Sequence, residues 1–536
     1  MINHELRRLP VSVTKFSKLR ESGKLYVDKT AQIATIAVND GKFAFFRPRR
    51  FGKSLLLSTF ESLFRYGLRD FRGLKIEKSW SDRTYDVVRL DFSAIRRFNS
   101  IDEYKEDFKC FLISAFRSAG FEYNPDDVLS VTYQLSSWLN SRPDSSLVLL
   151  IDEYDAPLTE ALNDPKRFDY IRSLLADFYA KIKSNEGCLR FFFLTGITKF
   201  QNANIFSELN DVTDLSLMPE YGTMLGFTRE EIEASFAPYV QRAAATLHLS
   251  PEEVLEQLTA HYDGYCFEST ATQHVYSTWS VLNFFSRPES GFANYWYRSA
   301  GEATVLMRYL ESHQLAAPEH FAEPCALTYE SLDAPKSLAS MSAPVLLTQT
   351  GYLTIRSVTA NGVFYTGYPN EEVSQSMAWL YASMCLQNPD ESKAKMSELP
   401  NALADGSVDD VMSFFNTAFA CIDYQKAPIV NEASCRSHLQ VLLIGACLLP
   451  SVEVHGAHGR SDLEVTVGNC HWVFEFKFLK KEATDADART AALLAEAEAQ
   501  MKSRGYLAKS LEKKRTIGVA LVFSEADRQL TAWKAL

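Results

Sequence analysis

The sequence lacks the features that mark secreted, metal-stapled or membrane-spanning proteins. Its nine cysteines are scattered without a Cys-x-x-Cys pair or a regular framework, which argues against a zinc site and a disulfide scaffold and favours a reducing compartment. Residues 1–8 contain no apolar signal core, and the longest apolar stretch, Val441–Leu449, is too short to span a bilayer. We therefore expect a cytoplasmic protein without a membrane partner.

An excess of positive charge is also missing. The net charge of -11 argues against a protein that coats nucleic acid along its whole surface, although a local basic groove is compatible with it. There is no internal repeat and no low-complexity segment. A hydrophobic content of 46% with 23% charged residues is ordinary for a globular protein, and 536 residues suffice for about two to four domains.

The most informative stretch present is Arg47–Ser54, which reads Arg-Pro-Arg-Arg-Phe-Gly-Lys-Ser. A P-loop has Gly, four variable residues and then Gly-Lys-Ser or Gly-Lys-Thr, so Arg47 stands where the first Gly belongs. An apolar run before the loop predicts a buried strand and the run after it predicts a helix, an order that aims backbone N–H groups at an anion. Lys53 is then expected to reach the β- and γ-phosphates of ATP, and Ser54 to ligate Mg²⁺. The predicted nucleotide contacts of the loop are Arg50, Phe51, Gly52, Lys53 and Ser54.

A second motif supports the nucleotide site. The apolar run Leu147–Ile151 has the length of a central parallel strand and ends in acidic residues. Acids at the carboxyl end of such a strand lie beside the P-loop crevice, so Asp152 is expected to hold Mg²⁺ and Glu153 to polarise the attacking water. An acidic turn that caps the next helix is the competing interpretation; it fits Asp155–Pro157 but leaves the strand end unexplained.

Up to about residue 235 short apolar strands alternate with helices, which predicts a parallel sheet covered on both faces. The expected strands are Phe43–Phe46, Val87–Phe92, Leu147–Ile151 and Leu189–Leu194. From about residue 228 the pattern becomes helical, and Thr228 is expected to cap the first of these helices. The aromatic-rich stretches Tyr262–Phe267 and Asn294–Tyr297 either stack on nucleic-acid bases or, as aromatic residues more often do, belong to the core.

Further charged residues are grouped near the end of the sequence. Residues 459–467 alternate apolar and polar side chains as a half-buried strand does, a Gly-Asn pair predicts a hairpin turn, and residues 472–478 form the returning strand. Because side chains alternate along a strand, Glu475 and Lys477 share one face, and Asp462 can come close to Glu475. Two carboxylates that hold Mg²⁺ and a lysine that steadies the attacking water suit metal-assisted phosphodiester cleavage.

An Asp followed by Glu-x-Lys is the signature of PD-(D/E)XK nucleases, while a charged solvent-exposed face of an amphipathic hairpin is the competing interpretation. The flanking sequence favours the nuclease. Glu432 begins an amphipathic helix, Ser434–Leu443, and Gln500 faces the sheet from a helix over Ala491–Tyr506 that precedes a strand, Thr516–Phe523. This order of helix, hairpin, helix and strand is the core of the nuclease fold, in which Glu432 and Gln500 would support cleavage.

Taken together, the chain resembles the bacterial family that joins an AAA-ATPase-like domain to a C-terminal PD-(D/E)XK nuclease domain. The family's loop typically has the same residues as Arg47–Ser54, so Arg47 departs from the general P-loop and not from these relatives. The resemblance covers nearly the whole length and rests on Tyr26–Thr30, Arg47–Ser54, Ile151–Asp155, Thr195-Gly196, Gly351–Ile355, Pro369–Val373, Gly459–Asp462 and Glu475–Lys477.

The resemblance implies an α/β fold: a P-loop, AAA-like parallel sheet with a helical lid, a helical connecting region and a C-terminal α/β nuclease-like domain. The expected boundaries are 1–227, 228–310, 311–425 and 426–536. AAA-type ATPases carry a polar sensor near the γ-phosphate, for which Thr195 and Lys199 are candidates; a strand that ends in a Thr-Gly turn is the alternative. Asp28 and Lys29 belong to a family motif near the nucleotide, without an assigned role.

The expected function is ATP binding and hydrolysis coupled to a Mg²⁺-dependent nuclease that acts on DNA, with ATP and Mg²⁺ as cofactors. A homo-oligomer is compatible with this expectation, and the sequence selects no arginine finger. The alternative is a nucleotide-switched regulatory or nucleic-acid-binding protein whose nuclease fold is not catalytic. In a third interpretation the C-terminal domain serves only for oligomerisation.

Overall fold

The structure is a computed structural model. It describes residues 6–95, 98–199, 211–296, 304–310, 313, 318–321, 324–333, 341–385, 398–420, 422, 424, 428–446, 448, 450–456, 459–482, 485–503 and 515–536, without the side chains of 304, 318–319, 333, 378, 381–385, 444–445, 451–456 and 459–460. The chain divides into two compact units. Unit 1 comprises Met1–Leu315 and Phe321–Val373, and unit 2 comprises Ala316–His320 and Ser374–Leu536. In the described part of the chain, no helix is both long and apolar enough to cross a membrane.

The centre of unit 1 is the predicted parallel sheet. Its strands lie in the order β2-β3-β4-β1-β5, and every neighbouring pair is parallel. The strands are β1 (Gly41–Phe46), β2 (Asp86–Asp91), β3 (Leu147–Asp152), β4 (Leu189–Gly196) and β5 (Thr213–Asp214). The first four were expected from their apolar runs, whereas β5 is too short to produce a pattern. The α/β class predicted from the sequence is confirmed.

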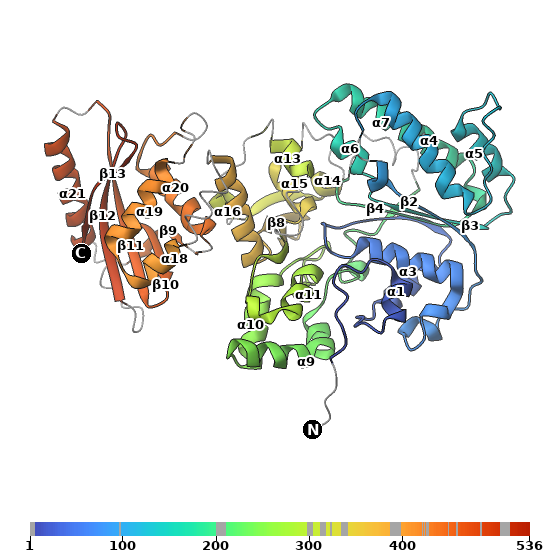
Figure 1. The fold of residues 1–536 in the computed structure, drawn as a ribbon, viewed down its shortest axis with the longest axis horizontal. Coiled ribbons are helices and arrows are strands. Elements are labelled where there is room, and N and C mark those ends of the chain that lie inside the picture. Colours follow the sequence, from blue (N-terminus) through green and yellow to red (C-terminus); the bar gives the residue numbers. More distant parts are fainter. Residues whose placement is uncertain are drawn as a thin grey trace. The chain divides into compact units, whose positions relative to one another are not determined.

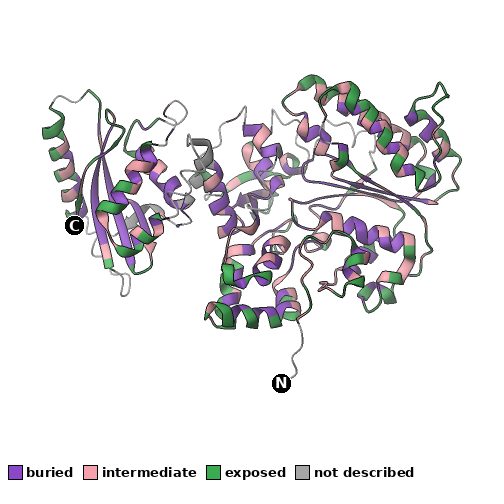
Figure 2. Ribbon diagram, in the orientation of Figure 1, coloured by how far each residue is buried: buried purple, intermediate pink, exposed green. Residues whose placement is uncertain are grey.

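Helices cover both faces of this sheet. In Figure 1 helices α1 and α3 lie on one face, and α4, α5 and α7 lie on the other. The elements of these layers are α1 (Phe16–Glu21), α2 (Thr30–Ala37), α3 (Lys53–Tyr66), α4 (Ile101–Arg117), α5 (Val131–Asn140), α6 (Ala156–Glu160) and α7 (Pro165–Ser184). All of β3 is buried, as the predicted central strand requires, while the helices expose one side (Figure 2). Aromatic packing joins α3 to β4, with ring centroids of Phe60 and Phe193 4.8 Å apart.

A helical group follows the sheet, as the sequence predicted. It contains α9 (Arg229–Leu247), α10 (Pro251–Tyr262) and α11 (Thr278–Ser286), which share one hydrophobic core. Helix α13 (Thr304–Leu310) instead contacts α6 and α15. Thr228 caps α9 in a capping box with Glu231, whose side chain accepts from the Thr228 N–H. Tyr262 and Tyr265 are fully buried, so these two aromatic residues of the first aromatic-rich stretch belong to the core; Tyr297 of the second lies outside the described residues.

Unit 1 is completed by a small antiparallel sheet of order β6-β8-β7. Its elements are β6 (Cys325–Thr328), α14 (Tyr329–Asp333), α15 (Ala343–Thr350), β7 (Thr354–Val358) and β8 (Val363–Gly367). The next helix, α16 (Glu371–Cys385), begins in unit 1 and continues into the sequence of unit 2.

Unit 2 has a mixed sheet of order β13-β12-β11-β10-β9, in which only β11 and β12 are parallel. Its elements are α18 (Leu399–Asp405), α19 (Val408–Ala420), α20 (Glu432–Gly445), β9 (Ser451–Gly456), β10 (Gly459–Val467), β11 (Cys470–Leu479), α21 (Ala486–Ser503), β12 (Arg515–Ser524) and β13 (Gln529–Ala535). Phe474 and Phe476 join the core beneath α18–α20, and Val473 packs on the opposite face with Ala497 of α21. The predicted alternation along β11 is therefore confirmed. Residues 504–506 of the helix expected over Ala491–Tyr506 lie outside the described residues.

Candidate functional site

The loop between β1 and α3 has the shape of an anion-binding turn. Gly52 has a φ of 98° and caps α3, and Arg50 also adopts a positive φ, of 70°. The Lys53 ammonium lies over the loop and donates to the carbonyl oxygens of Arg47 and Pro48 at 2.8 and 2.9 Å. Burial lowers the pKa of Lys53 to about 8, and the charge of Glu153 partly opposes this effect.

Arg47, the residue that breaks the general loop pattern, turns its side chain away into the protein. Its guanidinium donates to the carbonyls of Phe46 at 2.8 Å, Ser216 at 2.9 Å and Tyr221 at 3.2 Å. It also lies over the rings of Phe45 and Phe267, at 4.1 and 4.6 Å from their centroids. The side chain thus anchors the loop from behind and leaves the side on which the Lys53 ammonium lies open.

Asp152 ends β3 beside the loop, where the sequence placed it. Its side chain is 1% exposed, and Oδ2 accepts from Arg89 Nη2 at 3.1 Å. Oδ1 is buried and has no hydrogen-bond partner among the described residues. Burial raises the pKa of Asp152, while Arg89 and the nearby Ser54 hydroxyl oppose the rise. A buried carboxylate oxygen without a donor, close to the Ser54 hydroxyl, fits a hydrated Mg²⁺ ion.

Glu153 is held in a backbone conformation that is rare for its residue type, with a φ of 48°. Burial raises the pKa of Glu153, and Lys53 opposes the rise. Its neighbour Asp155 does not cap α6 with its side chain; the carboxylate accepts from the N–H groups of Ile197 and Thr198, at 3.2 and 2.9 Å. The acidic end of β3 is therefore tied to the end of β4.

The two sensor candidates lie in different surroundings. Thr195 is fully buried at the end of β4, and its hydroxyl has no hydrogen-bond partner in the part of the chain that the structure describes. Lys199 forms an ion pair with Asp214 of β5 and lies 5.6 Å from the ring centroid of Phe46. Of the two, only Thr195 thus retains a polar group that the described protein atoms leave unused.

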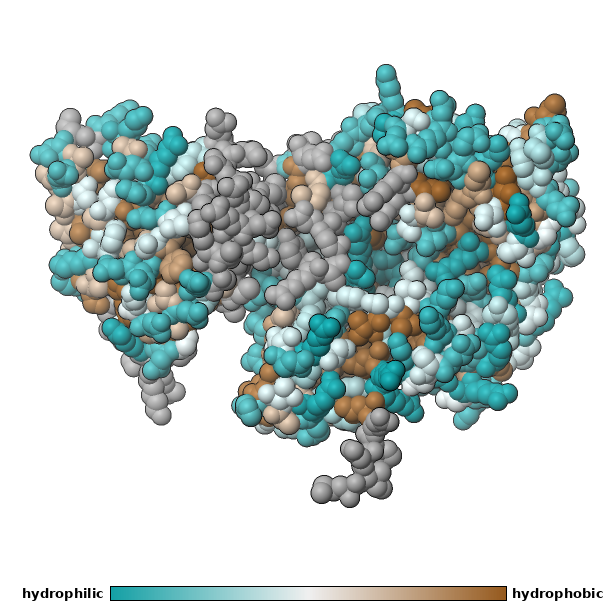
Figure 3. Space-filling model, in the orientation of Figure 1, coloured by the Kyte–Doolittle hydropathy of each residue, from teal (hydrophilic) through white to brown (hydrophobic). Residues whose placement is uncertain are grey.

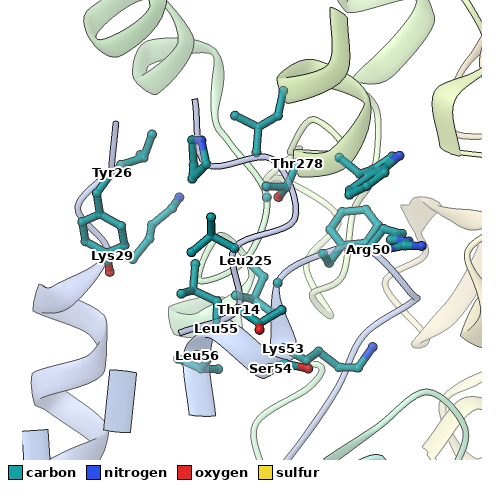
Figure 4. A pocket seen from close by; sticks show the side chains of 18 of the residues that line it. Thr14, Tyr26, Lys29, Arg50, Lys53, Ser54, Leu55, Leu56, Leu225 and Thr278 are labelled. Carbon is teal, nitrogen blue, oxygen red and sulfur yellow. The ribbon is translucent and has the colours of Figure 1, made fainter. Parts of the chain in front are cut away.

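A cavity of about 500 Å³ opens in front of the loop (Figure 4). Lys53 and Ser54 lie along one part of its wall, and Lys29 and Arg50 lie at other parts of the cavity. Its apolar lining comes from the N-terminal segment and the helical group: Val13, Leu25, Val27, Leu225, Phe227 and Leu282. Figure 3 shows apolar side chains gathered on this face between the helical group and α3. The cavity combines a cationic end with an apolar wall, as a nucleotide requires.

Two further residues line the cavity: Lys29, which the sequence placed near the nucleotide without a role, and Trp279, which it did not predict. Lys29 donates to the Thr223 carbonyl at 2.8 Å and pairs with Glu231 of the α9 capping box at 2.5 Å, which gives the Asp28-Lys29 motif a place between α2 and α9. The guanidinium of Arg50 lies 4.3 Å from the ring of Trp279. In the sequence only the family motif pointed to Lys29, and no pattern pointed to Trp279.

Residues far along the chain complete the wall behind the loop. Gly351 has a φ of 90°, and a Cβ there would lie 2.7 Å from Pro48 Cβ. The indole N–H of Trp296 donates to the Arg49 carbonyl at 3.4 Å. The Trp296 N–H itself donates to the buried Glu372 at 2.7 Å, and burial raises the pKa of Glu372 to about 8. Two segments of the family resemblance, Gly351–Ile355 and Pro369–Val373, thus supply residues that support the loop.

In unit 2 the predicted acidic and basic side chains meet on the hairpin. Lys477 Nζ lies 3.9 Å from Glu475 Oε1 and donates to Gln500 Oε1 of α21 at 3.1 Å. Asp462 Oδ2 accepts from the Phe476 N–H at 2.9 Å, which places it beside the same strand. Glu475 is fully buried and Lys477 is 7% exposed, so a solvent-exposed charged face does not describe this strand.

The two flanking helices add further charges. Burial raises the pKa of Glu432 on α20, with opposing attraction by Lys477 and additional repulsion by Asp462. Arg436 Nη1 lies 3.8 Å from Asp462 Oδ1, and Glu496 Oε1 lies 3.9 Å from Lys477. The sequence prediction missed Arg436 and Glu496, although each is one helical turn from a predicted residue: Arg436 from Glu432, and Glu496 from Gln500.

Few side chains at this site could ligate a metal ion. No group of three or more His, Cys, Asp or Glu side chains in the described ranges is arranged to hold a metal ion. Asp462 and Glu475 supply a carboxylate pair at the hairpin, the donor type that Mg²⁺ prefers, and Mg²⁺ usually completes its shell with water and substrate oxygens. The donor chemistry of this pair fits Mg²⁺.

Comparisons with known proteins match these two regions. Residues 10–206 match the family described as predicted AAA-ATPase, and residues 431–533 match the PD-(D/E)XK nuclease superfamily. A relative described as an uncharacterized protein in the vnfD 5' region of Azotobacter chroococcum mcd 1 is 28% identical over 513 residues, 93% of each chain. The solved Walker-type ATPase PABY2304 of Pyrococcus abyssi gives a TM-score of 0.34 at 12% identity, covering 70% of this chain and 99% of that one.

Proposed function

Because the chain joins a predicted AAA-ATPase domain to a domain of the PD-(D/E)XK nuclease superfamily, we propose that it binds and hydrolyses ATP and cleaves DNA in a Mg²⁺-dependent reaction coupled to the nucleotide state. One observation carries the proposal: at each site a buried lysine, Lys53 or Lys477, lies within the electrostatic reach of two or more carboxylates. Burying such a group of charges is costly unless they bind a charged ligand or one another.

At the ATP site, the Lys53 ammonium exchanges the loop carbonyls for phosphate oxygens when nucleotide binds. Ser54 and Asp152 would hold Mg²⁺, and Glu153 accepts a hydrogen bond from the attacking water. Thr195 is the sensor candidate in reach of the same region. At both sites Mg²⁺ supplies positive charge for phosphate oxygens.

At the hairpin, Asp462 and Glu475 would hold the metal, while Lys477 positions the attacking water and stabilises the charge that develops on the phosphate. Gln500 fixes the Lys477 ammonium through its 3.1 Å hydrogen bond, and Glu432 adds a carboxylate from α20. DNA is the proposed substrate and the cytoplasm the proposed location, the latter because the cysteines are scattered without a disulfide framework.

The ATP half is tested with Lys53→Ala. Removing the ammonium takes away the charge that meets the phosphates, so we expect ATP turnover to fall by about a hundredfold or more. Lys42→Ala is the matched control, because Lys42 pairs with Glu186 and Asp211 at the start of β1 and should leave turnover near that of the wild type. Unchanged hydrolysis in Lys53→Ala would refute the loop assignment.

The nuclease half is tested by incubating the full chain with plasmid and single-stranded DNA, with and without ATP and Mg²⁺. We expect Mg²⁺-dependent nicking that Lys477→Ala removes and that Lys480→Ala, at an exposed position just beyond the site, retains. Cleavage that persists in Lys477→Ala contradicts the assignment. Metal-independent retention of DNA without cleavage would instead support a nucleotide-switched binding protein.

A further inference from the structure

A half-buried arginine contacts the proposed metal ligand of the ATP site. Arg89 lies on β2, the strand next to β3, and its side chain is 21% exposed. Its Nη2 donates to Asp152 Oδ2 at 3.1 Å and to the Ser54 carbonyl at 3.4 Å. The guanidinium thus touches both residues assigned to Mg²⁺. Its sequence signal was weak, because Arg89 is one polar residue within an apolar run.

A second acid fixes the guanidinium in this position. Arg89 Nη1 lies 3.5 Å from Glu61 Oε2 on α3, and Glu61 in turn lies 3.5 Å from Arg65. Arg65 is held by the Val87 carbonyl at 2.5 Å. Charges therefore alternate from Arg65 through Glu61 and Arg89 to Asp152, and only Arg89 of the two arginines pairs with Asp152.

This arrangement has a consequence for cations. Arginine cannot lose its proton in a protein, so Arg89 places a permanent positive charge 3.1 Å from the Asp152 carboxylate. That charge offsets the attraction of Asp152 for a free divalent cation, and the effect is strong where water is excluded. The phosphates of a nucleotide bring several negative charges, so the net attraction of the site for a divalent cation rises when nucleotide binds.

We propose that Arg89 is a specificity-determining residue of the ATP site: it prevents divalent cations from occupying Asp152 alone and makes their binding depend on nucleotide. This inference rests on the proposed function only for the identity of the nucleotide. The exclusion of free cations follows from the Arg89–Asp152 contact itself. Oδ1 of Asp152, which is buried and lacks a partner among the described residues, remains available to the cation that arrives with nucleotide.

The test measures binding of Mn²⁺ to the nucleotide-free full chain by titration calorimetry. Every variant carries Asp462→Asn and Glu475→Gln, which remove the two proposed metal ligands of unit 2. We expect Arg89→Met to bind Mn²⁺ about tenfold more tightly than the parent, and adding Asp152→Asn to abolish the gain. Arg89→Gln, which is neutral but keeps a hydrogen-bonding amide, should show the same gain and decides the test if Arg89→Met does not fold.

Arg65→Met is the matched control, because it shortens the same charge network without removing a contact to Asp152. Its Mn²⁺ affinity should stay within about twofold of the parent. Equal or weaker Mn²⁺ binding in the Arg89 variants overturns the inference, as does a gain that survives Asp152→Asn. Because the readout needs neither ATP nor turnover, failure of ATP hydrolysis in the wild type would be recognised separately.

Discussion

Arg47 is a single residue whose side chain and backbone serve different purposes. Its backbone carbonyl holds Lys53 in front of the loop, while its guanidinium binds three carbonyls behind it. A general P-loop has Gly at this position, in a loop whose backbone N–H groups bind phosphate. In this chain the region behind the loop is built around the arginine.

Restoring the general pattern should therefore harm the protein. Arg47→Gly removes a buried charged donor and leaves the carbonyls of Ser216 and Tyr221 without it, so we expect a loss of about 2–4 kcal/mol in the free energy of unfolding and no gain in ATP affinity. Arg47→Lys keeps the charge but lacks the forked donors of arginine, so its free energy of unfolding should lie between those of the wild type and Arg47→Gly. Denaturant unfolding measures the loss. If Arg47→Gly is as stable as the wild type and binds ATP more tightly, the Arg47 side chain does not stabilise the loop.

The site residues that the sequence predicted were each found from the pattern of their immediate neighbours in the sequence. Asp152 and Glu153 end an apolar strand, and Glu475 and Lys477 alternate with buried phenylalanines, so the neighbouring residues alone placed them. Arg89 and Arg436 could not be found in this way. Their importance depends on β2 lying next to β3 and on α20 lying beside β10, and such neighbours are set by tertiary structure.

Among the elements, long apolar patterns were easier to predict than short or polar ones. The four main strands of unit 1 and the hairpin of unit 2 followed from runs or alternation, and Gly468 at the hairpin turn has the positive φ that such turns need. Helix α21 begins at Ala486, before the predicted Ala491, because an alanine-rich start carries little hydrophobic periodicity. Strand β5 consists of two residues and leaves no pattern.

The contact between α15 and the loop gives a prediction at the scale of elements. Gly351 ends α15 with a positive φ and meets Pro48, whereas Gly362, between β7 and β8, has a φ of 77° and nothing within 4 Å of an added Cβ. Gly362→Ala should lower the free energy of unfolding only by the conformational strain of alanine at a positive φ, about 1–2 kcal/mol. Gly351→Ala adds the overlap with Pro48. We therefore expect it to lose about 1–3 kcal/mol more in the free energy of unfolding than Gly362→Ala, and to bind nucleotide more weakly.

Thermal unfolding and nucleotide titration compare these two variants directly. Equal losses would show that the loop does not depend on its contact with Gly351. A loss of stability in Gly351→Ala with unchanged nucleotide affinity would confine the role of the contact to folding.

On the scale of the whole molecule, the chain consists of two units with separate hydrophobic cores. One core of unit 1 contains residues of α9, α10 and α11, and the main core of unit 2 contains residues of α18–α20 and its sheet. Nucleotide contacts are assigned only to unit 1 and the acid cluster of the hairpin only to unit 2. A ligand of one site should therefore stabilise mainly the unit that holds it.

We expect two calorimetric transitions. ATP with Mg²⁺ at about a hundredfold excess over its dissociation constant contributes about 2.7 kcal/mol, which should raise the Tm of unit 1 by about 3 °C. Lys53→Ala should remove the shift, and the Tm of unit 2 should stay in place. A single transition that moves as a whole would contradict independent unfolding.

The Pro48–Gly351 contact also bears on how the chain matures during synthesis. At about 5–20 residues per second, the loop leaves the ribosome many seconds before the glycine that packs against it. Until then Pro48 and the carbonyl of Arg49 lack their later neighbours, Gly351 and Trp296. The nascent sheet can form early, but the cavity in front of the loop acquires its final backing only after α9–α11 and the following segment have been translated.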